Sequence, residues 1–171
     1  MTDNVPENAH KGALSDPAVL LATWFGAGLL PFAPGTWGSL AALPFAWALH
    51  MSFGWSALGL AALAAFGIGI WAANGYVARL GGDDPGPVVI DEVAGQWLTL
   101  VPAAYLAPMA PNALTYLVAF VLFRIADIFK PWPASWADKK LHGGLGIMLD
   151  DIFAGLYAAA GLTFFILYWE T

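Results

Sequence analysis

The chain has 171 residues, of which 60% are hydrophobic and 11% are charged, whereas soluble domains have about 45–50% apolar and about 25% charged residues. This composition is typical of an integral membrane protein, and the net charge of −6 says less about partners than the distribution of the charges. The chain contains no cysteine, which excludes disulfide bonds, thiolate metal sites and enzymes with a cysteine nucleophile.

Residues 1–17 are polar and lack the basic start and short apolar core of a secretory signal. We interpret them as a cytoplasmic tail and residues 18–171 as a single membrane-embedded domain. The next segment, residues 18–32, is apolar but is interrupted by Gly26, Gly28 and Pro31. It could span the membrane, lie in the interface, or enter and return. We favour a short non-spanning helix, because that keeps the tail on the side of the basic loops.

Five further segments approach the roughly 20 apolar residues that a membrane-spanning helix needs: 37–53, 55–78, 93–110, 113–129 and 147–169. The predicted fold class is therefore all-α, a polytopic bundle of about five spanning helices. The turns at Gly54 and at 107–112 are short and uncharged, whereas the connections 78–92 and 130–144 carry most of the polar residues. In an antiparallel bundle these two polar connections share one face, and its Lys and Arg residues predict that it is cytoplasmic.

Five carboxylates lie at the mouths of three predicted helices: Asp91, Glu92, Asp127, Asp150 and Asp151. Carboxylates beside the hydrocarbon cost a few kcal/mol, so they usually face the protein interior and serve a function. If they share one centre, each pair repels by about 4 kcal/mol at about 4 Å and an effective dielectric of about 20. They then need a cation, and oxygen ligands suit magnesium first, or calcium or manganese. The competing interpretation, capping of helix N-termini, fits the two adjacent pairs but not Asp127 at a helix C-terminus.

Asp127 has a cation three residues to either side, Arg124 and Lys130. This spacing puts the three side chains on the same side of a helix. They could form a plain salt-bridged surface. Alternatively, the two cations bind an anionic group such as a phosphate while Asp127 faces the metal.

A second candidate anion site is APGTWGSL at residues 33–40. Thr36, Gly38 and Ser39 gather there at a predicted helix N-terminus, where free backbone N–H groups bind anions. N-capping by Thr36 alone is the competing interpretation. His142 is either a general acid for a leaving group or a solvated loop residue.

Four motifs, PFAPGTWGSL, VVIDEVAGQWLTL, FRIADIFKPWP and HGGLGIMLDDIFAG, together resemble the phosphatidylglycerophosphatase A family in order and spacing, over about residues 18–160. The resemblance implies a magnesium-dependent enzyme of the bacterial inner membrane that removes the terminal phosphate of phosphatidylglycerophosphate to give phosphatidylglycerol. It implies metal and catalytic roles for the five carboxylates, of which we take Asp91, Asp127 and Asp151 as the catalytic candidates. It also implies that Arg124, Lys130, Thr36 and Ser39 lie near the phosphate.

Two mechanisms stay open, metal-assisted attack by water and an aspartyl-phosphate intermediate on Asp127 or one of the paired acids. An ion- or proton-coupled transporter would use the same carboxylates. Their gathering at one face and the lack of an internal repeat favour the enzyme. The predicted partners are the lipid substrate and the bilayer, without nucleic acid, and the oligomeric state is left open.

Overall fold

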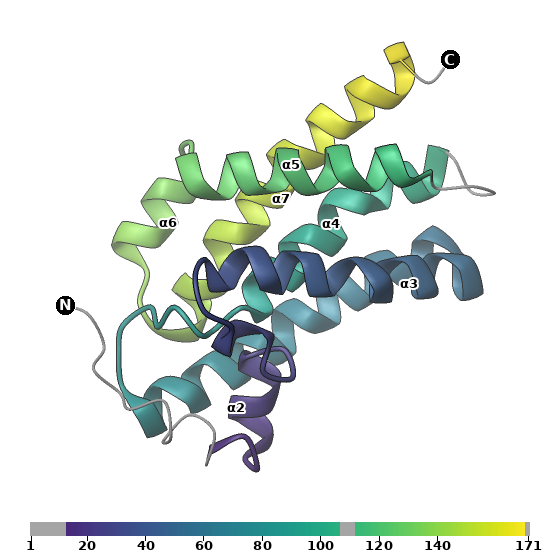
Figure 1. Cartoon of the computed structure of the whole chain (residues 1–171). Coiled ribbons are helices and arrows are strands. Elements are labelled where there is room, and N and C mark those ends of the chain that lie inside the picture. The colour runs from purple at the N-terminus through teal and green to yellow at the C-terminus, as the bar shows by residue number, and fades with distance from the viewer. Residues whose placement is uncertain (1–12, 107–111, 170–171) are drawn as a thin grey trace.

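The computed structural model describes residues 13–106 and 112–169, and all regular structure in them is helical (Figure 1). The helices are α2 (Pro17–Ala22), the 3-10 helix η1 (Ala27–Leu29), α3 (Pro34–Leu80), α4 (Ile90–Leu106), α5 (Ala113–Phe129), α6 (Ala134–Lys140) and α7 (Gly143–Trp169). The predicted all-α class is confirmed. Most of the predicted tail, residues 1–12, and most of the predicted turn, residues 107–111, lie outside the described residues.

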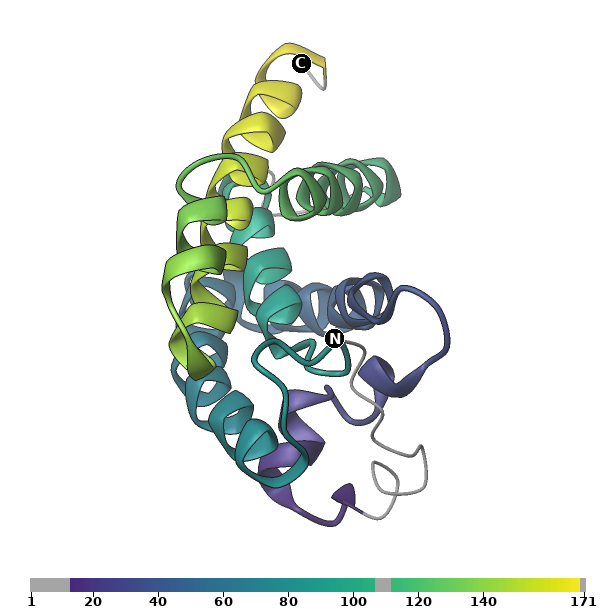
Figure 2. The ribbon, with the colours of Figure 1, turned by 90° about the vertical axis from the view of Figure 1, so that its left-hand side faces the viewer.

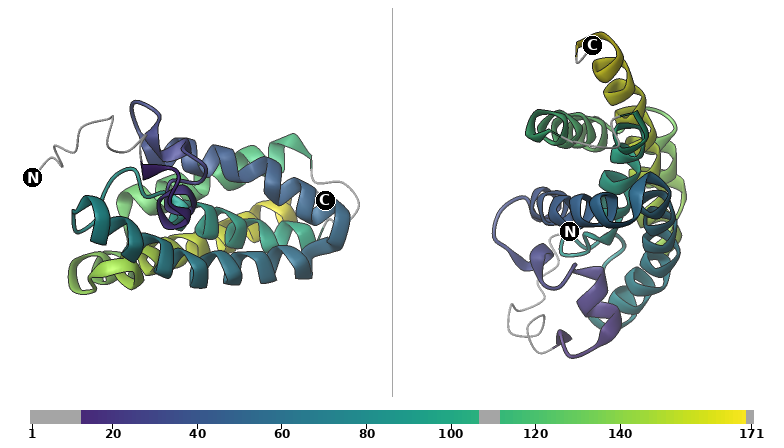
Figure 3. Two further views of the ribbon diagram at one scale, coloured as in Figure 1. Left: turned by 90° about the horizontal axis from the view of Figure 1, so that it is seen from below. Right: turned by 90° about the vertical axis from the view of Figure 1, so that its right-hand side faces the viewer.

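Helix α3 consists of two helices joined at Gly54, whose φ of 79° and ψ of −176° are not helical. Glycine adopts this backbone at low cost because it has no Cβ. The two halves, residues 34–53 and 55–80, run in opposite directions (Figures 1 and 3). The predicted turn at Gly54 is therefore confirmed. The first half begins at Pro34, earlier than predicted, because proline is well accommodated in the first turn of a helix.

Helix α4 packs against both α3 and α7. Gly95 of α4 faces Gly155 of α7 so closely that a Cβ on Gly155 would lie 2.7 Å from the Gly95 carbonyl oxygen. On its other side, Trp97 of α4 donates a hydrogen bond from Nε1 to the carbonyl oxygen of Ala42 in α3, at 2.9 Å. Such close approach through small residues is typical of helix packing in membranes.

Two of the described helices, α3 and α7, are long and apolar enough to cross a membrane. Helices α4 and α5 have 17 residues each, which is the lower end of the range of about 17–25 for a span. These lengths therefore do not establish the predicted count of five. Large apolar side chains are exposed on several helices, among them Leu60, Leu63, Leu117 and Phe164. Extensive exposed apolar surface indicates contact with lipid or a partner.

The two ends of the bundle differ in chemistry. One end carries α6, the connection between α3 and α4, and the segment with α2 and η1 (Figures 1 and 2); we call it the polar end. Helix α2 has six residues, about 9 Å, which is shorter than a membrane span and agrees with the predicted short helix; that the segment does not span stays a prediction. Asp16 caps α2 by accepting a hydrogen bond from the Ala18 N–H at 2.8 Å and pairs with Arg79 near the end of α3.

Two predicted boundaries near the polar end are wrong. The predicted loop 130–144 contains α6, and α7 begins at Gly143 rather than at residue 147. The glycine pair resembles a loop in sequence, but the N–H of Gly144 donates to Asn74 Oδ1 of α3 at 2.8 Å. The Asn74 side chain thus accepts a hydrogen bond from an N–H group in the first turn of α7, and the helix begins earlier than predicted. Asp150 and Asp151 consequently lie two turns inside α7 and do not cap its N-terminus.

Candidate active site

A cleft of about 300 Å³ lies at the polar end, between residues of α3, α4, α5 and α7. It is lined by all five predicted carboxylates and both predicted cations: Asp91, Glu92, Asp127, Asp150, Asp151, Arg124 and Lys130. Residues that the sequence grouped by chemistry therefore lie together in space, and their roles stay predictions.

Three of these carboxylates form a buried cluster, Asp91 and Glu92 from the first turn of α4 and Asp151 from α7. Each offers one oxygen, and the three oxygens all lie within 4.8 Å of one another. Within the described residues, Asp91 Oδ1, Glu92 Oε2 and Asp151 Oδ2 are buried without a hydrogen-bond partner. Clustered buried carboxylates repel one another unless protons or a cation compensate their charge. Three convergent oxygen donors fit a hard divalent ion.

The contact between Gly95 and Gly155 sets the spacing of this cluster. Asp91 precedes Gly95 by four residues on α4, and Asp151 precedes Gly155 by four residues on α7. Residues four apart lie on the same helix face, one turn from each other. The glycine contact therefore brings together the faces from which the carboxylates project.

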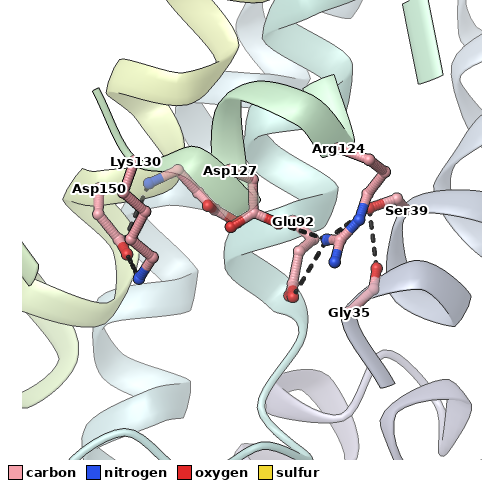
Figure 4. A network of polar contacts seen from close by, with 8 residues as sticks. Gly35, Ser39, Glu92, Arg124, Asp127, Lys130 and Asp150 are labelled. Atoms are coloured by element: carbon pink, nitrogen blue, oxygen red, sulfur yellow. Dashed lines mark hydrogen bonds and ion pairs between the residues drawn. The ribbon is translucent and has the colours of Figure 1, made fainter. Parts of the chain in front are cut away.

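Arg124 of α5 joins the cluster to α3 (Figure 4). Its Nη1 lies 2.5 Å from Asp127 Oδ2 and 3.7 Å from Glu92 Oε1. It also donates to Ser39 Oγ at 3.5 Å, and the Ser39 hydroxyl donates to the Gly35 carbonyl oxygen at 2.8 Å. The Arg124 and Asp127 side chains are only 16% and 13% exposed, so their ion pair is a mostly buried one. The Arg124 Nε is buried without a partner among the described residues, which leaves a donor for an anionic group.

Lys130 follows α5 as its C-cap residue and bridges two carboxylates. Its Nζ donates to Asp138 Oδ1 of α6 at 2.5 Å and to Asp150 Oδ2 of α7 at 2.6 Å. Burial alone would lower the pKa of Lys130, but the hydrogen bonds to Asp138 and Asp150 outweigh burial and raise the pKa above its ordinary value. Lys130 is therefore a fixed positive charge. If Asp150 also bound a metal ion, its carboxylate would have to contact both the ion and Lys130.

The start of α3 differs from the predicted anion site. Ala33 is the N-cap, in a left-handed conformation with φ of 48°, so Thr36 lies inside the first turn and the N-capping interpretation is wrong. The N–H groups of Thr36 and Trp37 both donate to the Ala33 carbonyl oxygen, at 2.9 and 3.4 Å. These two donors are already used within the chain, which weakens the argument for a backbone anion site here.

The two glycines of this segment have different surroundings. A Cβ on Gly38 would lie 2.6 Å from Val89 Cβ, so Gly38 allows α3 to approach the connection before α4. A Cβ on Gly35 would lie 2.0 Å from Glu92 Oε1 and 3.0 Å from Arg124 Nη1. Gly35 therefore lies against the charged groups of the cleft.

Two acidic residues near the cleft, Asp84 and Asp138, were not among the site residues predicted from the sequence. Asp84 lines the cleft and also a pocket of about 50 Å³ beside it, which is lined in addition by Asp138, His142 and Asp150. Asp84 directly precedes Pro85 in the sequence GGDDPGP, and such Asp-Pro-Gly sequences are typical of tight turns. This turn signal could have indicated Asp84 as a further candidate. The contact of Asp138 with Lys130 depends on α6 and had no sequence signal. His142 lines the small pocket and is not among the residues lining the cleft.

Comparisons with known proteins identify the family. A family profile described as Phosphatidylglycerophosphatase A matches residues 20–166. The chain belongs to the phosphatidylglycerophosphatase A family. The phosphatidylglycerophosphatase A of Escherichia coli (strain K12) is 42% identical to it over 154 residues, covering 90% of this chain and 85% of that protein. That of Haemophilus influenzae is 38% identical over 172 residues, covering 99% of each.

A third relative, from Bacteroides thetaiotaomicron, is 40% identical over 151 residues, covering 82% of this chain and 87% of that protein, and has a provisional name as a phosphatidylinositol-3-phosphatase. No solved structure matches the chain. The relatives all carry names of lipid phosphatases, so the family predicted from the four motifs is confirmed. The names and the two long apolar helices together indicate a membrane phosphatase.

Proposed function

We propose that this protein hydrolyses the terminal phosphomonoester of phosphatidylglycerophosphate and releases phosphatidylglycerol and phosphate. The observation that carries the proposal is the convergence of three carboxylates, each with a buried oxygen that has no hydrogen-bond partner among the described residues, on a cleft that also contains Arg124 and Lys130. Carboxylates that can hold a cation, next to fixed positive charges, are what phosphoryl transfer requires. The relatives named as phosphatidylglycerophosphatase A support this substrate.

The proposed cofactor is magnesium, with Asp91, Glu92 and Asp151 as ligands and with Asp127 and Asp150 beside them. Magnesium is commonly held by one or two carboxylates together with substrate phosphate, and when bound it would neutralise phosphate charge and make a bound water more acidic. Asp127 orients the Arg124 guanidinium through their ion pair.

The phosphate itself is assigned to the two cations. Arg124 offers its unpartnered Nε to the phosphoryl oxygens in the planar geometry that suits phosphate. Lys130 supplies a point charge, held in place by Asp138 and Asp150. The nucleophile is either water or a carboxylate, of which Asp127 is the first candidate.

We further propose that the chain crosses the membrane five times, with both halves of α3 and with α4, α5 and α7 as the spans. Five cationic residues lie at the polar end or on its connections: Arg79, Arg124, Lys130, Lys139 and Lys140. An excess of Lys and Arg in short loops marks the cytoplasmic side. The polar end would then face the cytoplasm, at the inner membrane of a bacterium.

The test is phosphate release by the detergent-solubilised protein, with magnesium and after its removal by a chelator. The substrates are phosphatidylglycerophosphate, phosphatidic acid and glycerol 3-phosphate. We expect magnesium-dependent release and kcat/KM values in that descending order, because acyl chains hold the phosphate at the depth of the cleft. Equal turnover of glycerol 3-phosphate would contradict the lipid substrate, and full activity without divalent ions would contradict the metal. A transporter would release no phosphate.

A further inference from the structure

An apolar groove lies between the first half of α3 and α5, apart from the charged cleft. Its volume is about 540 Å³, and its lining includes Leu40, Leu43 and Trp47 of α3 and Tyr116, Leu117 and Phe120 of α5. Figure 2, which looks along the bundle from the polar end, shows these two helices nearly end-on. Nothing in the proposed chemistry of the cleft uses this groove.

The end of the groove nearer the cleft lies one helix turn from Ser39 and Arg124. On α3, Leu43 lies one turn beyond Ser39; on α5, Phe120 lies one turn before Arg124. Because residues four apart share a helix face, the contact between Arg124 Nη1 and Ser39 Oγ at 3.5 Å lies at the polar end of the groove. A molecule whose phosphate contacts Arg124 therefore has an apolar groove about one helix turn further along the bundle.

The groove and the helix turns that join it to the cleft together match one leaflet of a bilayer. The residues lining the groove cover about 10 Å along each helix, from Leu40 to Trp47 on α3 and from Phe120 to Ala113 on α5. With the turns up to Gly35 and Arg124 included, the distances are about 18 Å along α3 and about 17 Å along α5. One leaflet contributes about 15 Å, half of a hydrocarbon core of about 30 Å. Trp47 and Leu117, at 53% and 57% exposed, leave the groove open at its side.

We propose that this groove holds one acyl chain of the lipid substrate while the substrate's phosphate lies at Arg124. The inference rests on the proposed function and extends it, because it assigns the recognition of the lipid to named residues outside the charged cleft. The occupant is an acyl chain of the substrate because the groove is lined mainly by apolar side chains, lies one helix turn from the Arg124 cation, and reaches the depth of a leaflet together with the turns that lead to the cleft.

Leu117→Trp tests the proposal by filling the groove. Its matched control is Leu114→Trp, on the same helix, where the leucine is 48% exposed and is not among the residues lining the groove. For each variant, kcat/KM is measured with phosphatidylglycerophosphate carrying palmitoyl chains and with the same headgroup on butyryl chains. We expect Leu117→Trp to lower the long-to-short ratio about tenfold, the scale of poor fit in an apolar pocket. We expect Leu114→Trp to keep the wild-type ratio, and an unchanged ratio in Leu117→Trp overturns the proposal.

A second measurement does not depend on turnover. A phosphatidylglycerophosphate analogue with a diazirine near the end of one acyl chain is photolysed with the wild-type protein, and the labelled peptides are mapped. Labels within residues 40–47 and 113–120 are expected; labels elsewhere, or cross-links between two copies across this groove, overturn the proposal. If the wild-type protein hydrolyses neither lipid, the proposed function itself fails. If it hydrolyses both and every variant keeps the same ratio, only the groove assignment fails.

Discussion

At the scale of single residues, Gly35 is a cleft residue with no space for a larger side chain. A methyl group there would lie 2.0 Å from Glu92 Oε1 and 3.0 Å from Arg124 Nη1, so Gly35→Ala must displace charged groups. Alanine is favoured over glycine in a helix by about 1 kcal/mol, and this partly offsets the steric cost to stability. We expect kcat/KM to fall by about a hundredfold, the typical effect of misplacing catalytic groups by about 1 Å.

The control for this prediction is Gly67→Ala on the second half of the same helix, where a Cβ would meet no atom within 4 Å. Gly67→Ala should keep wild-type kcat/KM and should be equally or more resistant to thermal unfolding. Wild-type activity in Gly35→Ala would show that Glu92 and Arg124 can move without consequence for the reaction.

The buried carboxylates lead to a second prediction at this scale. Asp91→Asn and Asp151→Asn each remove one charge from a cluster whose members repel one another. Without magnesium we therefore expect the variants to be at least as stable as the wild type. Their activity should fall by about a hundredfold or more, the scale of removing one stabilising group from a transition state, and magnesium should no longer raise Tm, because a lost ligand weakens binding to the folded state.

Thermal unfolding monitored during a magnesium titration measures this effect. Asp83→Asn serves as the control, because Asp83 is exposed in the connection between α3 and α4 and is not among the residues lining the cleft. An equal rise of Tm with magnesium in wild type and both cluster variants would contradict the shared metal site.

The residues that the sequence grouped together line one cleft, whereas their pairings were not predicted. Five carboxylates at the ends of apolar helices are conspicuous because a charged side chain next to the hydrocarbon costs free energy. Which carboxylate meets Lys130 depends on the position of α6 and α7, and periodicity does not report that position. Asp150 therefore belongs to the predicted metal set, whereas in the structure it is paired with Lys130.

At the scale of helices, the contact between α4 and α7 controls the spacing of the carboxylates. A Cβ on Gly155 would lie 2.7 Å from the backbone oxygen of Gly95, and a backbone cannot move aside as a side-chain tip can. Gly155→Ala should therefore separate Asp151 from Asp91. We expect loss of activity together with a lower Tm, measured by phosphate release and thermal unfolding.

Gly161→Ala is the matched control on the same helix. There the nearest atom is Leu122 Cδ1 at 3.3 Å, the end of a flexible side chain that can rotate away. This variant should stay close to wild type in both measurements. Equal effects of the two substitutions would indicate general sensitivity of α7 rather than a specific role of its contact with α4.

Helix boundaries were predictable where capping chemistry is local. Helix α5 spans Ala113–Phe129 as predicted, because Asn112 accepts a hydrogen bond from the Thr115 N–H at 2.7 Å and marks the start in the sequence. The start of α7 was not predictable, since the partner of Gly144 is Asn74, seventy residues away. Capping by a distant helix leaves no local sequence signal.

At the scale of the whole molecule, the chemistry is asymmetric along the bundle. The cleft lies at the polar end, and the apolar groove lies along the first half of α3 and α5. The sequence predicted the helical class and the gathering of charge at one end. It did not fix the number of spans, because α4 and α5 have lengths at which a membrane span and a buried soluble helix cannot be distinguished by length alone.

The orientation of this asymmetric bundle can be tested with single cysteines, because the chain has none of its own. Lys139→Cys on α6 and Ser52→Cys near the turn at Gly54 place exposed probes at opposite ends of the bundle. If the basic connections are cytoplasmic, an impermeant maleimide should label Ser52→Cys in intact cells and Lys139→Cys only after permeabilisation. The reverse pattern would place the cleft outside, and labelling of both in intact cells would contradict the three spans (the second half of α3, α4 and α5) proposed between them. Retained phosphate release by both variants establishes that the labelled molecules are folded, so the pattern reports the orientation of the active protein.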